Sequence, residues 1–129
     1  MSDKFTVEII SPDKSILVTE ASEVVIPSYE GEMGILKDHI SIITFLRPGL
    51  IKIINETEKI FFVDDGIVEF SNNNLLILSS TAKEKSNIDQ NTLDALINEA
   101  EEKFSKNTLT DKERYLLSYR ITTLKNINQ

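Results

Sequence analysis

The hydrophobic period of the chain changes once, and this change constrains the fold more than any other feature of the sequence. Up to about residue 80, apolar residues alternate with polar ones, as at Phe5, Val7 and Ile9, which is typical of half-buried β-strands. From Asp89 onward, apolar residues recur every three or four positions, which is typical of amphipathic helices. The sequence therefore predicts an α+β fold, mainly β, in which a β domain is followed by a helical segment.

The β part contains short strand candidates separated by turn-forming residues, a spacing typical of a sandwich or a barrel. The candidates are residues 5–9, 16–19, 24–26, 41–46, 50–54, 59–63, 67–70 and 75–78. Residues 28–34, with two glycines, are interpreted as a loop, and Asp65-Gly66 as a tight turn. Residues 60–63 and 75–78 are apolar at every position, so we expect two central strands that are covered on both faces.

The helical part predicts two helices, residues 89–104 and 111–127, joined by a short turn. Thr110 and Glu113 form the T-x-x-E pattern of a capping box at the start of the second helix. Each helix carries a single apolar stripe, so the pair buries too little surface to be stable alone. It must pack on the β domain or on a partner, and permanent docking and a mobile hairpin both remain open. We expect a β domain over residues 1–85 and a hairpin domain over residues 86–129.

Composition excludes several classes of function. The chain has 129 residues, no cysteine, one histidine and a formal net charge of −7. Disulfides, thiol catalysis and multi-histidine metal sites are therefore excluded, and we expect no metal and no cofactor. The acidic balance argues against nucleic-acid binding and against docking on anionic lipid. No apolar run reaches the ~20 residues of a spanning helix, and the first residues do not resemble a signal peptide, so a cytoplasmic location is expected.

No catalytic set of residues is recognisable in the sequence. His39 is the single histidine, and serines and acids elsewhere in the chain say nothing about the geometry of a triad. A small hydrolase is therefore the least favoured function. A stand-alone β-sandwich binding module, with helices that only cover one face, remains an alternative.

Three segments resemble the epsilon subunits of F-type ATP synthases. Residues 24–39 read VVIPSYEGEMGILKDH, and residues 46–53 read LRPGLIKI. Residues 65–69, DGIVE, are similar to the family's glycine-glycine-apolar-apolar-glutamate hairpin, with Asp65 in place of the first glycine. The order of the β and helical parts and the total length agree as well, so the resemblance covers nearly the whole chain.

The resemblance implies a ten-stranded β-sandwich followed by an antiparallel two-helix hairpin. It further implies a non-catalytic subunit of the central stalk that binds the gamma subunit and the c-ring and couples proton translocation to ATP synthesis. In bacterial members the hairpin can reach the alpha/beta catalytic hexamer and restrain ATP hydrolysis. The expected location is peripheral, on the cytoplasmic face of the bacterial inner membrane, with no insertion into lipid and no contact with nucleic acid.

The resemblance also assigns contact residues. The c-ring contact is expected at Tyr29, Glu30, Gly31, Glu32 and Met33, and the gamma contact at Ser11, His39 and Thr44. The second helix has four basic and two acidic residues, which would suit an acidic segment of the catalytic beta subunits. We therefore expect the contact with the hexamer at Arg114, Arg120 and Lys125.

One motif of the family is incomplete. Some bacterial members bind ATP through an [IL]-D-x-x-R-A sequence at the start of the first helix. Ile88 and Asp89 match it, but Thr92 stands where the arginine would be and Leu93 where the alanine would be. Without the arginine, a phosphate loses a donor with two parallel N–H groups, so we expect weak or no ATP binding at Ile88 and Asp89.

Overall fold

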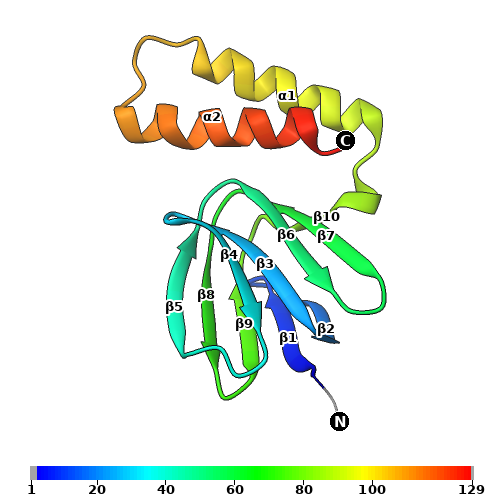
Figure 1. Ribbon diagram of the computed structural model, residues 1–129. Helices are drawn as coiled ribbons and strands as arrows, with labels where there is room; N and C mark the ends of the chain where they lie inside the picture. The colour runs from blue at the N-terminus through cyan, green and yellow to red at the C-terminus, as the bar shows by residue number, and fades with distance from the viewer. Residues whose placement is uncertain (1–2, 129) are drawn as a thin grey trace.

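Ten strands fold into two layers, and two helices lie across one end of these layers (Figure 1). This computed structural model describes residues 3–128. The strands are β1 (Phe5–Ile10), β2 (Ser15–Ala21), β3 (Glu23–Ser28), β4 (Gly31–Leu36), β5 (Ile42–Leu46), β6 (Gly49–Ile54), β7 (Glu58–Val63), β8 (Gly66–Ser71), β9 (Asn74–Leu78) and β10 (Lys83–Glu84). The helices are η1 (Lys85–Asn87), α1 (Gln90–Phe104) and α2 (Asp111–Asn126).

The strand order explains the two layers. It runs β10-β7-β6-β3-β5-β8-β9-β1-β2, and β4 pairs only with β3. β3 and β5 meet at a single residue pair, Ser28 and Leu46, so the sheet folds over at this point. β1 runs parallel to β9, and the other strand pairs are antiparallel. The expected sandwich with a C-terminal helical hairpin is confirmed.

The core fills the space between the layers. Alternating residues of the strands point into it, as the period of two predicts. Its fully buried members include Val7, Ile9, Val24, Ile26, Ile35, Leu46, Ile51, Phe61, Val63, Val68, Phe70, Leu75 and Ile77. All of these belong to the strands, so the sandwich closes its main core without the helices.

The expected loop over residues 28–34 is wrong in most of its length. Only Tyr29 and Glu30 form the turn, and β4 begins at Gly31. Gly31 has φ +117°, a conformation that residues with a Cβ rarely adopt, and it allows this tight reversal. The two glycines suggested a loop, but Gly31 directly follows the turn as the first residue of β4 and Gly34 lies within that strand.

The two apolar runs have different surroundings. In β7, Phe61 points into the main core, whereas Phe62 points to the opposite face and packs under the helices, so this strand is covered on both faces. In β9, Leu75 and Ile77 are buried, but Leu78 remains 41% exposed. The expectation is wrong for β9 because the hairpin covers only the layer of β6 and β7.

The predicted tight turn at Asp65-Gly66 does not join two paired strands. β7 pairs with β6, and β8 pairs with β5 and β9, so this turn carries the chain from one layer to the other. Gly66 is required there because its φ is +155° and a Cβ would lie 2.6 Å from the carbonyl oxygen of Leu78.

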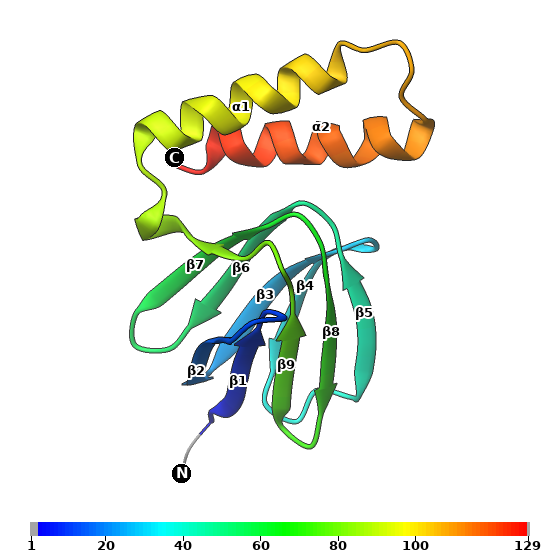
Figure 2. The ribbon, with the colours of Figure 1, turned by 180° about the vertical axis from the view of Figure 1, so that it is seen from behind.

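The hairpin packs on the sandwich through a small apolar cluster of its own. Figure 2 shows from behind how α1 and α2 lie over the end of the sandwich. Phe62 of β7 meets Leu93 of α1 and Leu124 of α2, and Ile127 closes the cluster. Partly buried apolar side chains surround them, namely Leu50, Ile88, Leu96 and Ile97. This cluster is separate from the main core, so the hairpin is docked through a second, smaller apolar contact.

Candidate functional site

An exposed apolar row crosses the outer face of the second layer. Phe45 of β5 lies opposite Ile67 of β8, Ile67 opposite Leu78 of β9, and Leu78 opposite Ile10 of β1. Phe45 is 58% exposed, and Ile67 and Leu78 are each 41% exposed. Monomeric proteins rarely expose continuous apolar surface unless a partner covers it. We call Ile10, Phe45, Ile67 and Leu78 the outer-face row.

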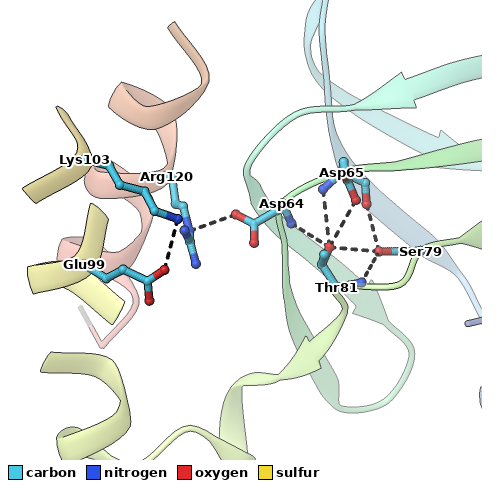
Figure 3. A network of polar contacts seen from close by, with 7 residues as sticks. All are labelled: Asp64, Asp65, Ser79, Thr81, Glu99, Lys103 and Arg120. Atoms are coloured by element: carbon cyan, nitrogen blue, oxygen red, sulfur yellow. Dashed lines mark hydrogen bonds and ion pairs between the residues drawn. The ribbon is translucent and has the colours of Figure 1, made fainter. Parts of the chain in front are cut away.

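A groove of about 620 Å³ lies beside this row. Its polar wall comes from Ser11, Asp65 and Ser79. Figure 3 shows how this wall is braced: the Ser79 hydroxyl donates to the carbonyl oxygen of Asp65 (2.8 Å), and the amide of Asp64 donates to the Thr81 hydroxyl (3.0 Å). The groove therefore combines apolar floor residues with a fixed rim of hydroxyl and carbonyl groups.

The three expected gamma contacts do not form one cluster. Ser11 directly follows β1 and lines the groove, where its hydroxyl donates to the carbonyl oxygen of Lys14 (3.1 Å). His39 precedes β5 at the opposite end of the layer, and its ring packs edge-on against Phe70 with centroids 5.9 Å apart. Thr44 shares the inner side of β5 with Leu46 and is half-buried. The outer-face row crosses the strands at the Ser11 end of the layer, away from His39.

The expected c-ring contact forms the tip of the β3–β4 hairpin, which we call the tip (residues 28–33). The Ser28 hydroxyl donates to the carbonyl oxygen of Gly31 (2.7 Å) and accepts from the amide of Glu30 (3.3 Å), so the turn is braced from inside. Tyr29, Glu30 and Glu32 are exposed. Met33 instead packs against the main core. The exposed part of the tip thus offers one aromatic ring and two carboxylates.

A ladder of rings joins the tip to the hairpin. Tyr29 stacks on Tyr115 of α2 with centroids 6.5 Å apart, and Tyr115 meets Tyr119 edge-on at 4.9 Å. The guanidinium of Arg47 lies 3.9 Å above the Tyr119 ring, a cation–π contact. Two elements that are distant in sequence, the tip and the first half of α2, are thereby in direct contact.

An ion pair joins the hairpin to the corner between the layers. Arg120 Nε and Asp64 Oδ1 are 3.0 Å apart, and the two side chains are 16% and 29% exposed (Figure 3). Burial, the largest influence, raises the pKa of Asp64 above its usual value, and the attraction of Arg120 lowers it by less. The ion pair therefore only partly compensates for the burial of this carboxylate.

The other two basic residues expected at the hexamer are engaged within the hairpin. Arg114 donates to the carbonyl oxygens of Phe104 (3.4 Å) and Lys106 (3.0 Å) and so closes the turn between the helices. Lys125 pairs with Glu101 of α1 at 3.1 Å, and both side chains are about half exposed. In the docked hairpin, Arg114, Arg120 and Lys125 all have partners inside the chain.

Comparison with known proteins identifies the family to which the chain belongs. Residues 4–85 match the family model described as "ATP synthase, Delta/Epsilon chain, beta-sandwich domain", which spans more than half of the chain. The chain belongs to the ATP synthase delta/epsilon family. A member from Pelagibacter ubique, named ATP synthase epsilon chain, is 48% identical over 130 residues, which is 99% of this chain and 100% of that relative. ATP synthase epsilon chain 2 of Nitrobacter hamburgensis is 30% identical over 84% of this chain and 81% of its own length.

Two solved structures share the fold of this delta/epsilon chain. One comes from the Euglena gracilis mitochondrial ATP synthase (OSCP/F1/c-ring), with a TM-score of 0.76 and 19% identity over 99% of this chain and 81% of the other. The second comes from the central stalk and c-ring of the Tetrahymena thermophila enzyme, with a TM-score of 0.65 and 16% identity over 96% of each chain. The sandwich and its helical hairpin are thus found together in proteins of low sequence identity.

In this delta/epsilon chain, the incomplete ATP motif serves the fold. Asp89 is the N-cap of α1, and its carboxylate accepts from the amide of Thr92 (2.7 Å), which lowers its pKa. Ile88 and Leu93 contribute to the apolar cluster under the hairpin. Capping and packing explain the residue types at 88, 89 and 93 without a nucleotide.

Metal and membrane features are limited to two observations. Within residues 3–128, no group of three or more histidine, aspartate and glutamate side chains is arranged to hold a metal ion. None of the helices described there has the length and apolar character that crossing a bilayer requires.

Sequence reasoning missed the residues that join the hairpin to the sandwich. Arg47 stands out in the sequence only as part of the family motif, and Asp64 only as the neighbour of the tight turn at Asp65-Gly66. Tyr115 and Tyr119 occupy positions four apart on one side of the second helix, which was the one available signal. The apolar outer face also had a signal, because Ile43 and Phe45 alternate with half-buried neighbours in β5.

Proposed function

We propose that this chain is the epsilon subunit of a rotary ATP synthase central stalk, that it binds gamma and the c-ring, and that it performs no catalysis itself. The outer-face row is the observation that carries this proposal. It places three large exposed side chains, Phe45, Ile67 and Leu78, side by side on neighbouring strands. Buried apolar area of this kind is the main source of affinity in stable protein contacts.

The gamma subunit is the partner proposed for the outer-face row. Ser11 directly follows Ile10 of the row, so a partner seated on the row would meet it, and the same partner would have to extend along β5 to reach His39 at the opposite end of the layer. Bound in this way, the sandwich would turn with gamma as one body. The core supports that role because it is closed by the strands themselves.

The c-ring is the partner proposed for the tip. Glu30 and Glu32 are exposed there, and the turn is braced by Ser28, so the carboxylates are held in a fixed position for basic or polar groups of the ring. Contacts at both the row and the tip would couple proton translocation in the ring to rotation of gamma and to ATP synthesis at the alpha/beta hexamer. The chain would then lie at the membrane surface, on the cytoplasmic side, through its partners.

The hairpin is the element proposed to restrain ATP hydrolysis. It is docked through a small cluster around Phe62, through one ion pair and through aromatic contacts, so its release costs little compared with unfolding the sandwich. Once the hairpin is released, Arg120 loses Asp64 and would become available to acidic groups of the catalytic hexamer. Arg114 and Lys125 would join it if α1 and α2 also separate, because their partners lie within the hairpin.

Binding to purified gamma subunit tests the proposal directly. Phe45→Ser combined with Ile67→Ser should weaken binding at least about tenfold in calorimetry, because two buried apolar anchors are lost. Leu36→Ser is the matched control, since Leu36 is 55% exposed but lies on β4, away from the row. Equal affinities of the double variant and the control would contradict the assignment. A chain that binds neither gamma nor the c-ring would instead favour a stand-alone binding module.

A further inference from the structure

In the contact between Asp64 and Arg120, the attraction of the two charges only partly offsets the cost of burying the carboxylate. Arg120 lies on α2, and Asp64 directly follows β7, with 3.0 Å between Nε and Oδ1 (Figure 3). Both atoms are shielded from solvent, and neither has a hydrogen-bond partner. The two groups are therefore held by charge attraction in a partly dry contact, where attraction and the cost of desolvation are both larger than at the surface.

The surroundings of Asp64 make Arg120 its main compensating charge. Asp65 is a second carboxylate next to it in the chain, and Lys83 and Lys103 act more weakly than Arg120. Lys103 is in addition paired with Glu99 at 3.1 Å. Loss of Arg120 would leave a partly buried carboxylate beside another acid, under the helical hairpin.

A charge that loses its partner in a shielded site is destabilising, whereas removal of both partners is often neutral. An unpaired Asp64 carboxylate would regain water if α2 moved away from the corner. Loss of the partner charge would therefore shift the equilibrium between the docked and the released hairpin. The main core of the sandwich, which the strands close, would not be affected.

We propose that Asp64 makes docking of the hairpin depend on Arg120, so that an acidic partner that takes Arg120 also releases the hairpin. This inference rests on the proposed role of the hairpin at the catalytic hexamer. Asp64 is a positioning residue: it holds Arg120 while the hairpin is docked, and it opposes docking once Arg120 is engaged elsewhere. Capture of Arg120 and release of the hairpin then become one event.

Energy transfer between two labels on the complete chain tests this inference. The sequence has no cysteine, so cysteines introduced at Thr57, between β6 and β7, and at Asn107, between α1 and α2, carry the two dyes. Both positions are exposed. The transfer efficiency reports the ratio of released to docked hairpin, and circular dichroism reports whether the helices remain formed.

Three variants distinguish a charge-dependent contact from ordinary packing. Arg120→Met keeps an apolar stem and should raise the released-to-docked ratio about tenfold. Lys112→Met removes the same charge from an exposed position of α2 and should change the ratio less than about twofold. Adding Asp64→Asn to Arg120→Met should restore docking most of the way to the wild-type ratio. Equal ratios for the single and double variants, or for Arg120→Met and Lys112→Met, would overturn the proposal.

A glutamate decamer then tests the exchange of Arg120. The peptide should release the wild-type hairpin and should release Asp64→Asn much less, because no carboxylate is left uncompensated in that variant. Equal responses, or no release of the wild type, would refute the exchange. All of these measurements use the isolated chain, so failure to bind gamma or the c-ring would not alter them.

Discussion

The ring of Tyr29, at the tip of the β3–β4 hairpin, stacks on the ring of Tyr115 in α2 with an angle of 12° between the two planes. The two residues are 40% and 38% exposed, so each also presents ring surface to solvent. The expected c-ring contact and the hairpin therefore meet at one pair of side chains. Any partner that binds Tyr29 in the tip also meets the hairpin.

Removal of the Tyr29 ring should weaken docking of the hairpin. We expect Tyr29→Ala to lower the free energy of unfolding by about 1 kcal/mol, the contribution typical of an aromatic pair beyond its buried area. Tyr29→Phe keeps the ring and should stay close to the wild type. Urea titration followed by circular dichroism measures both. Identical values for the alanine and phenylalanine variants would show that the stack contributes nothing.

Truncation after Ser86 should leave a folded sandwich. The main core lies entirely within the strands, and β10 ends at Glu84, before the cut. Phe62, now 2% exposed, would lose its cover, and we expect the fragment to self-associate through it. Circular dichroism and light scattering measure the two effects. Phe62→Ser in the fragment should restore a monomer, whereas Val18→Ser, at a side chain already 65% exposed, should not. An unfolded fragment would contradict this prediction.

Acidification should weaken the helices through their N-terminal caps. Hydrogen bonds from Thr92 lower the pKa of Asp89, and hydrogen bonds from Thr110 lower the pKa of Glu113. Because both pKa values are lower in the folded chain, the stabilisation is complete above the unfolded values of 3.8 and 4.5 and is lost as the pH falls through the folded ones.

Thermal melts of the helical signal at a series of pH values measure this effect. Asp89→Asn combined with Glu113→Gln should flatten the acid side of the profile. Asp13→Asn removes an exposed carboxyl group in the turn after β1 and should leave the profile as it is. A double variant that keeps the wild-type slope would exclude the caps as its source.

Gly31 of the tip and Gly34, just after it in β4, should differ in their tolerance of a side chain. Gly31→Ala places a Cβ on a residue with φ +117°, and we expect a loss of about 1–3 kcal/mol from backbone strain together with weaker binding to the c-ring. In Gly34→Ala the nearest atom is a flexible carboxylate oxygen of Glu23 at 3.2 Å, so the loss should be smaller. Thermal unfolding of both variants measures the two losses of stability. A larger loss for Gly34→Ala than for Gly31→Ala would count against the turn assignment.

Much of the fold could be predicted from local patterns. The alternation at Phe5, Val7 and Ile9 and the capping box at Thr110 and Glu113 are both present in the structure. β4 was not predicted because its two glycines are typical of a loop. They form part of a strand here because β4 pairs with β3. β10 has two residues, too few for a period to be visible, and it forms because β7 offers a free edge.

The candidate site was only partly predictable. The family motif located the tip and Arg47, but it said nothing of their contacts with the hairpin. Tyr29, Arg47 and Tyr119 come together only after the sheet folds over and the helices return across it. Asp64 and Arg120 are 56 positions apart, and no local pattern links them. Contacts of this type follow from tertiary structure, which periodicity cannot supply.

The pairing of β10 with β7 has a mechanical consequence. This pairing holds the chain on the sandwich up to Glu84, so residues 85–89 alone link the hairpin to the sandwich. Five residues span at most about 17 Å when fully extended. A released hairpin would therefore remain attached at a fixed point beside β7. The length of this five-residue linker, more than the affinity of any surface, would limit how far α1 and α2 can move from the sandwich.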